Sequence, residues 1–158
     1  MNDTQQAAPG PGTAVTSGPV FCPSFRYVDA PRAIAWLVRA FGFEKQAVYA
    51  NDDGTIAHAQ LTFGSGVIML GSASNAGSWN VRSPQEAGVA TGGTYVILER
   101  DEDVDRHCAQ ARAAGAQIIL EPESPDYGGR SYSARDLEGY YWSFGSYRPL
   151  PPETSERH

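Results

Sequence analysis

The chain has 158 residues, of which 41% are hydrophobic and 19% are charged. This length and composition predict one globular domain with a sizeable core rather than a disordered chain. The formal net charge of −6 argues against binding to nucleic acid or to an anionic membrane, because both require clustered positive charge. No apolar run has transmembrane length, and the N-terminus lacks the pattern of a secretory signal. We therefore expect a cytoplasmic protein.

Composition divides the chain into a domain with two tails. Residues 1–19 are rich in Pro, Gly and small polar residues, which predicts a disordered tail. Residues 20–149 form the predicted domain, and residues 150–158 form a polar tail. The two cysteines, Cys22 and Cys108, are expected as buried thiols, although their spacing leaves a disulfide open.

Residues 20–71 are predicted to form a strand, a helix and three further strands. Asp29 is a favourable N-cap for the helix, and Gly42 provides a C-terminal stop. The segment 51–54, Asn-Asp-Asp-Gly, predicts a tight hairpin turn between two strands. The expected elements are a strand at 20–28, a helix at 30–41, and strands at 43–50, 55–63 and 67–71.

Residues 94–147 repeat this order after a connection at residues 72–93 that is rich in Gly, Ser and Asn. Asp101 or Asp103 is expected to cap the second helix. The expected elements are a strand at 94–98, a helix at 103–114, and strands at 117–120, 130–135 and 140–146. The predicted fold is a mixed α/β (α+β) domain of two β-α-β-β-β modules that form a curved sheet around a cavity, the usual place for a small ligand.

The last strand shows a clear alternation of side chains. Residues 136–139, Asp-Leu-Glu-Gly, have the composition of a turn, and an aromatic, β-favouring segment follows. Because side chains alternate along a strand, one face is expected to cover the core: Tyr140, Trp142 and Phe144. Tyr141 and Ser143 lie between them in sequence and should therefore line the cavity.

The segment Asp136-Leu-Glu-Gly-Tyr-Tyr-Trp-Ser-Phe144 resembles the closing strand of the vicinal-oxygen-chelate superfamily. This superfamily contains glyoxalase I, bleomycin-resistance proteins and extradiol dioxygenases. Residues 27–37 and the segment Ala40-Phe-Gly-Phe43 resemble the first strand and helix of the same family, so that the resemblance covers roughly residues 20–149. It implies paired modules around a cavity that a second chain commonly completes, and we therefore expect a homodimer.

Metal-dependent members of this family place four ligands, His or Glu and sometimes Gln, on four strands. The resemblance carries these positions to Cys22, Gln60, Thr94 and Ser143. Sites for Zn, Ni, Fe and Mn need imidazole, carboxylate or thiolate donors, whereas a hydroxyl is a weak ligand and Gln offers only a dipole. His58 shares a face with Gln60 and is a substitute donor, but the set still falls short of three ligands. No metal cofactor is expected.

The candidate ligand-binding residues comprise these positions and their neighbours on the same faces and loops: Cys22, Ser24, Arg26, His58, Gln60, Trp79, Thr94, Tyr127, Arg130, Tyr132, Tyr141 and Ser143. Each has a structural alternative. Arg26 pairs either with an acidic ligand or with a protein carboxylate, and His58 is either a wall residue or a base. Residues 127–130 carry a Tyr-Gly-x-Arg pattern similar to one in this family, or are ordinary loop anchors. His107 is expected to be solvated and uninvolved.

The poor metal ligands and the supply of aromatic residues favour a metal-free small-molecule-binding protein of the bleomycin-resistance type. Such a protein sequesters a hydrophobic or aromatic ligand in a cavity shared by two chains. The alternative is a glyoxalase-like lyase, isomerase or dioxygenase, with or without a metal, in which His58 is a candidate general base. A module that binds a protein partner is a third possibility. Neither a phosphate-binding glycine loop nor a nucleophile elbow is present in the sequence.

Overall fold

The computed structural model describes residues 18–149. The tail predicted at residues 150–158, and the tail predicted at residues 1–19 except its last two residues, lie outside the described residues. None of the helices among residues 18–149 is both long and apolar enough to cross a membrane.

The two predicted modules are confirmed. Module one comprises β1 (Ser24–Tyr27), α1 (Ala30–Phe41), β2 (Glu44–Ala50), β3 (Ile56–Phe63) and β4 (Gly66–Ser72). Module two comprises β5 (Gly93–Ile97), α3 (Asp101–Ala113), β6 (Gln117–Glu123), β7 (Ser131–Arg135) and β8 (Tyr141–Gly145). The connection between the modules holds the short helices η1 (Ala73–Asn75), η2 (Gly77–Trp79) and α2 (Pro84–Ala87).

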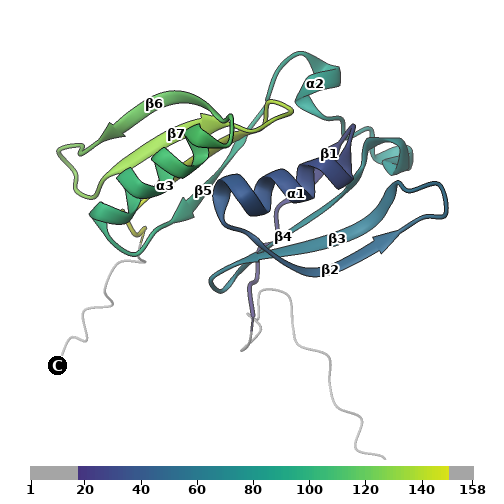
Figure 1. Cartoon of the computed structure of the whole chain (residues 1–158), viewed down its shortest axis with the longest axis horizontal. Helices are drawn as coiled ribbons and strands as arrows, with labels where there is room; N and C mark the ends of the chain where they lie inside the picture. The colour runs from purple at the N-terminus through teal and green to yellow at the C-terminus, as the bar shows by residue number, and fades with distance from the viewer. Residues whose placement is uncertain (1–17, 150–158) are drawn as a thin grey trace, which may run out of the picture.

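Each module folds into its own four-stranded mixed sheet (Figure 1). The strand order is β1-β4-β3-β2 in sheet one and β5-β8-β7-β6 in sheet two. In each sheet the first pair is parallel and the other two pairs are antiparallel. The helix that follows the first strand of each module crosses over to reach the opposite edge of the sheet, as a parallel arrangement requires.

Local signals set the helix boundaries. The Asp29 carboxylate accepts a hydrogen bond from the Arg32 amide at 3.1 Å, and Gly42 ends α1 with a positive φ of 81°. The helix therefore spans residues 30–41 as predicted. In α3 the N-cap is Arg100, and the Asp103 carboxylate accepts from the Arg100 amide, so this helix begins two residues before the predicted start.

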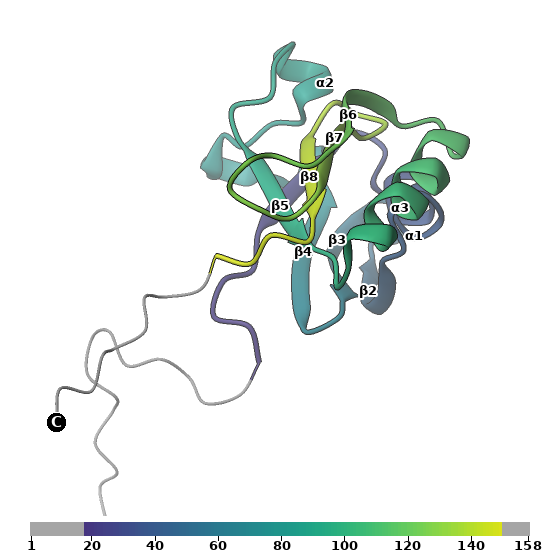
Figure 2. The ribbon, with the colours of Figure 1, turned by 90° about the vertical axis from the view of Figure 1, so that its left-hand side faces the viewer.

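The two helices lie side by side, on the same side of the two sheets (Figures 1 and 2). The Trp36 indole donates from α1 to the Ala114 carbonyl at 2.8 Å, and the Gln110 amide of α3 donates to the Arg39 carbonyl at 3.0 Å. The helix-facing sides of both sheets share one hydrophobic core, in which Phe25 of sheet one is stacked on Trp142 of sheet two at 5.1 Å. The opposite side of each sheet, its outward face, points away from this core.

A buried carboxylate ties the two modules together. Asp136, in the turn before β8, accepts hydrogen bonds from the Tyr27 hydroxyl at 2.7 Å and from the Trp142 indole at 3.0 Å. Burial raises the pKa of the Asp136 carboxyl, and the hydrogen bonds from Tyr27 and Trp142 partly oppose this rise. The Tyr27 phenol, fully buried beside this carboxyl, has a pKa raised well above its usual value by that burial.

Glu138 in the same turn holds the beginning of α1. Its carboxylate accepts from the Val28 amide at 2.6 Å, from the Asp29 amide at 2.9 Å and from the Ser83 hydroxyl at 2.6 Å. The turn that precedes the last strand of module two therefore fixes the first strand–helix junction of module one and, through Ser83, the connection before α2.

Candidate functional site

The outward face of sheet one carries a chain of hydrogen-bonded polar side chains. His58 Nε2 lies 3.0 Å from Gln60 Oε1, and Gln60 Nε2 donates to Gln46 Oε1 at 2.8 Å. Because an amide oxygen only accepts, the proton of a neutral His58 ring lies on Nε2, and Nδ1 keeps a free lone pair. The ring of Tyr49 is stacked against His58 at 6.2 Å. The prediction that His58 and Gln60 share a face is confirmed by their pairing in β3.

Arg26 lies at the β1 edge of the same outward face. It pairs with Gly71 in β4, and a Cβ atom at Gly71 would come within 2.4 Å of Arg26 Nη1. A glycine is therefore needed for the guanidinium to lie across the strand. Ser24 shares this face and is exposed, whereas Cys22 precedes β1 and is half-buried. Cys22 and Cys108 are both free thiols, which settles the open question of a disulfide.

The outward face of sheet two carries three hydroxyl groups that bond to one another. Tyr141 Oη donates to Ser133 Oγ at 2.9 Å, Ser133 Oγ lies 2.7 Å from Ser143 Oγ, and Ser143 Oγ donates back to Tyr141 Oη at 3.3 Å. Sequence reasoning found Tyr141 and Ser143 but missed Ser133. The alternation of polar and apolar residues along β7, Ser-Tyr-Ser-Ala-Arg, was the signal that places Ser133 on this face.

The prediction that Thr94 shares the face of Tyr141 and Ser143 is wrong. In the parallel pairing of β5 with β8, Thr94 lies opposite Trp142, which points into the core, and Tyr95 lies opposite Ser143. Side chains alternate along β5, so Tyr95 belongs to the outward face and Thr94 to the other side. Tyr95 was also missed, and its hydroxyl donates to the Tyr147 carbonyl at 2.8 Å.

Tyr132 and His107 also lie elsewhere than predicted. Tyr132 is only 1% exposed and is stacked on Phe144 at 5.4 Å, so it is a core residue rather than a cavity wall. His107 is not solvated, because its Nδ1 lies 2.6 Å from the Tyr132 hydroxyl and its Nε2 lies 2.7 Å from the Phe41 carbonyl. Burial lowers the pKa of His107, and the bond to Phe41 partly opposes that shift. Both residues fill the space between the helices and sheet two.

The remaining candidate residues lie in loops. Trp79 in η2 is 72% exposed and Tyr127 is 75% exposed. The Tyr127 ring makes an edge contact with Tyr147 at 5.6 Å. Arg130 forms a two-pronged ion pair with Asp105 at 2.8 Å for both contacts, which is the structural alternative considered for it. The structure therefore gathers the candidates into two separate outward faces and a set of loop residues, and one chain does not bring the two faces together.

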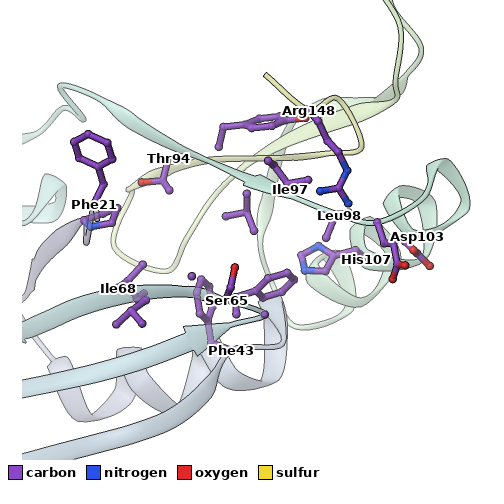
Figure 3. Close-up of a pocket in the computed structure, with 18 of the residues that line it drawn as sticks. Phe21, Phe43, Ser65, Ile68, Thr94, Ile97, Leu98, Asp103, His107 and Arg148 are labelled. Carbon is purple, nitrogen blue, oxygen red and sulfur yellow. The ribbon is translucent and has the colours of Figure 1, made fainter. Parts of the chain in front are cut away.

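A hollow of about 780 Å³ lies at the seam between the sheets. Phe43, Ser65 and Ile68 line one wall and β5 lines the other, while α3 contributes His107 at one end (Figure 3). Phe21 is 88% exposed at the opposite end. The volume is in the range of small-molecule sites.

The side chains at the expected ligand positions do not fit a transition-metal site. Gln60 and Ser143 supply an amide and a hydroxyl. The third ligand position was assigned to Thr94, but the β5 residues that share the outward face with Tyr141 and Ser143 are Gly93 and Tyr95. Across residues 18–149, no three His, Cys, Asp or Glu side chains form a group that could hold a metal ion. These donors are neutral and hydrogen-bond to their neighbours, which suits an organic ligand better than a divalent cation.

Comparison with known proteins gives a consistent result. The model of the Glyoxalase/Bleomycin resistance protein/Dioxygenase superfamily matches residues 23–144. The crystal structure of TioX from Micromonospora sp. ML1 is 35% identical, covers 81% of this chain and 98% of its own, and has a TM-score of 0.60. The uncharacterized protein Rv0887c of Mycobacterium tuberculosis is 29% identical over 143 residues, which are 86% of this chain and 79% of that protein.

A more distant structure shares the fold. The fosfomycin resistance protein FosX from Listeria monocytogenes, solved with Mn(II) and sulfate, has a TM-score of 0.61 at 14% identity. The alignment covers 83% of this chain and 93% of FosX. At this level of identity the similarity concerns the arrangement of the modules and not the chemistry of the site.

Proposed function

Because the chain belongs to the Glyoxalase/Bleomycin resistance protein/Dioxygenase superfamily, we propose that it binds and sequesters a hydrophobic or aromatic small molecule without a metal ion. The observation that carries this proposal is the chemistry of the outward faces. Gln60 and Ser143, at positions where metal-dependent members carry ligands, hydrogen-bond to neutral neighbours. Such groups orient an organic ligand but hold a divalent cation poorly.

Aromatic side chains supply the apolar part of the proposed site. Tyr49 lies on the outward face of sheet one, and Tyr95 and Tyr141 lie on the outward face of sheet two. Aromatic rings bury a large area and stack on planar ligands. The net charge of −6 favours a cationic rather than an anionic ligand at long range. Cys22 and Cys108 are free thiols, which fits the reducing conditions of the cytoplasm.

We propose that a second copy of the chain completes the site. In one chain the two faces are separate, so that a ligand on either face would remain open to water on one side. A homodimer that packs across the seam hollow would enclose the faces and would bury the apolar side chains at its mouth, which include Phe21 and Ile97. Closed two-fold pairs are the commonest soluble oligomers.

The oligomeric state is tested with two matched substitutions. Ile97 and Ile119 are both 38% exposed, but only Ile97 is among the residues that line the seam hollow. We expect the wild-type chain and Ile119→Lys to sediment as dimers at micromolar concentration and Ile97→Lys to sediment as a monomer. A monomeric wild-type chain would contradict the proposal.

Ligand binding is tested by titrating aromatic antibiotics into the protein while tryptophan fluorescence is recorded. Tyr141→Ala removes one stacking surface and should weaken binding by about 1–3 kcal/mol, as loss of such a surface does elsewhere. Tyr141→Phe keeps the ring and should retain most of the affinity. Absence of any saturable response across a broad panel would argue against sequestration. Equal affinity of wild type and Tyr141→Ala would show that the ligand does not bind against Tyr141 on sheet two.

An enzyme is the second candidate function, and one observation favours it. The hydrogen bond to Gln60 directs His58 Nε2 toward the amide, which leaves Nδ1 as a candidate base. Elemental analysis of the purified chain distinguishes the metal-dependent version of this candidate. About one metal ion per chain, lost in Gln60→Ala or His58→Ala, would overturn the metal-free proposal.

A further inference from the structure

The hydroxyl ring of sheet two is a closed cycle of three hydrogen bonds. Tyr141 and Ser143 are separated by one residue on β8, and Ser133 lies opposite Ser143 on β7. The pairing of strands thus brings the three oxygens within 2.7–3.3 Å of one another. In this cycle each hydroxyl donates one bond and accepts one, so that each is satisfied without any other partner.

The same arrangement is also suited to a Tyr141 phenolate. If Tyr141 loses its proton, the hydroxyls of Ser133 and Ser143 can both turn their hydrogens toward Oη, without any movement of the oxygens. Hydrogen bonds to an ionised acceptor are roughly twice as strong as those between neutral groups. These two bonds hold the pKa of Tyr141 below its usual value, although partial burial opposes the shift.

Other phenols of the chain behave in the opposite way. Burial raises the pKa of Tyr27, Tyr132 and Tyr140, and it also raises the pKa of Tyr95 despite the bond that Tyr95 donates to Tyr147. Tyr141 therefore differs from these tyrosines in having two serine hydroxyls within hydrogen-bonding distance of its oxygen.

We propose that Tyr141 is an acid–base group of this face, held by Ser133 and Ser143 so that it can exchange its phenolic proton with a bound oxygen acid. The matching ligand class is a phenol, an enol or an activated hydroxyl. In the forward step the Tyr141 O–H bond breaks and an O–H bond forms on the ligand oxyanion. The negative charge moves to Tyr141 Oη, where both serine hydroxyls donate to it. The reverse step restores the phenol and returns the charge to the ligand.

The charged and titratable groups around Tyr141 are few. On β7, Arg135 lies directly opposite Tyr141. On β6, Glu123 lies opposite Ser131, two residues along from Ser133. On β5, Tyr95 lies opposite Ser143. Ser143 occupies a position where metal-dependent relatives carry a ligand, but its hydroxyl is engaged in the ring, and the proposal involves no ion.

The test measures the ionisation of Tyr141 directly in the full chain and requires no ligand. Tyrosine labelled with ¹³C at the ring carbon that bears the hydroxyl is followed by NMR as the pH is raised, and Tyr141→Phe assigns the signal. We expect Tyr141 to ionise below the ordinary tyrosine pKa of about 10 and before Tyr27, Tyr95, Tyr132 and Tyr140.

Three serine variants separate the proposed role from a purely structural one. Ser133→Ala and Ser143→Ala each remove one donor to the phenolate and should each raise the pKa of Tyr141. Ser131→Ala, on the same strand and the same face but outside the ring, should leave it unchanged. An ordinary or raised pKa of Tyr141 in the wild-type chain overturns the proposal, and so does a pKa that neither Ser133→Ala nor Ser143→Ala changes.

Discussion

The two modules share one order of elements, yet their outward faces have different chemistry. Module one displays an amide–imidazole chain that runs from Gln46 through Gln60 to His58, whereas module two displays the ring of hydroxyls around Tyr141. The repeated fold therefore determines which positions face outward, while the residues at those positions decide the chemistry independently in each module.

The modules also differ in how they hold each other. Module two sends two buried carboxylates, Asp136 and Glu138, to the first strand and helix of module one. Tyr140 adds a hydroxyl that donates to the Arg26 carbonyl at 2.9 Å and accepts from the Arg26 amide at 3.0 Å, which covers part of the free edge of β1. The turn before β8, residues 136–139, together with Tyr140 therefore links module two to module one, and substitutions in this turn should have the largest effects on stability.

Asp136→Ala should have the largest effect. It leaves the Tyr27 hydroxyl and the Trp142 indole buried without an acceptor, and also removes the acceptor of two backbone amides. Each unsatisfied buried group costs about 1–3 kcal/mol, so we expect a loss of at least about 3 kcal/mol of unfolding free energy. Denaturant unfolding followed by tryptophan fluorescence measures it. Asp126→Ala, at an exposed loop position, is the control and should change little.

Glu138→Ala should rank second. The carboxylate accepts from two backbone amides of module one and from Ser83, and its loss should cost about 2–3 kcal/mol in the same assay. Ser83→Ala breaks only the bond to the connection and weakens the cap of α2, so it should cost about 1 kcal/mol. Equal losses of stability in the two variants would show that Glu138 stabilises the fold mainly through Ser83 in the connection and not through the Val28 and Asp29 amides.

Gly93→Ala tests the close packing on the outward face of sheet two. A Cβ atom at Gly93 would come within 2.4 Å of the Tyr141 ring and 3.1 Å of the Tyr141 carbonyl, so we expect a loss of about 1–2 kcal/mol from overpacking. Gly92→Ala is the matched control, because nothing lies within 4 Å of its Cβ position. Similar stability of the two variants would show that Tyr141 can move aside.

The contributions of Asp136, which is buried, and of Asp105, which is exposed and paired with Arg130, should depend on pH in opposite directions. Burial raises the pKa of Asp136 above its unfolded value of about 3.9, so its contribution is complete below that pH and is lost as the pH rises through the folded pKa. The bond from Arg130 lowers the pKa of Asp105, so its contribution is present above about pH 3.9 and is lost as the pH falls through the lowered folded pKa.

The measurement compares each Asp→Asn variant with the wild-type chain by denaturant unfolding across this pH range. As the pH rises, the stability of wild type relative to Asp136→Asn should fall, and its stability relative to Asp105→Asn should rise slightly. Slopes of the same sign for both comparisons would contradict the assignment of a raised pKa to Asp136.

Part of the site was predictable because it depends on local rules. The alternation of side chains in β3 and β8 placed His58 with Gln60 and Tyr141 with Ser143, and both pairs share a face in the structure. The face of Thr94 was not predictable in this way. It depends on the register of β5 against β8, in which paired residues are 48 apart in sequence, and a shift of one residue exchanges the two faces of a strand.

The sequence by itself determined the main helices and strands of the two modules and their order, since caps, turns and alternation act over a few residues. Asp29 and Gly42 set the bounds of α1, and the same rules gave two modules of one plan. Only the tertiary structure decided how the modules meet. His107 bonds to the Phe41 carbonyl 66 residues away and Glu138 bonds to Val28 110 residues away. Such contacts depend on how the two helices pack against each other and against the sheets, which no local pattern encodes.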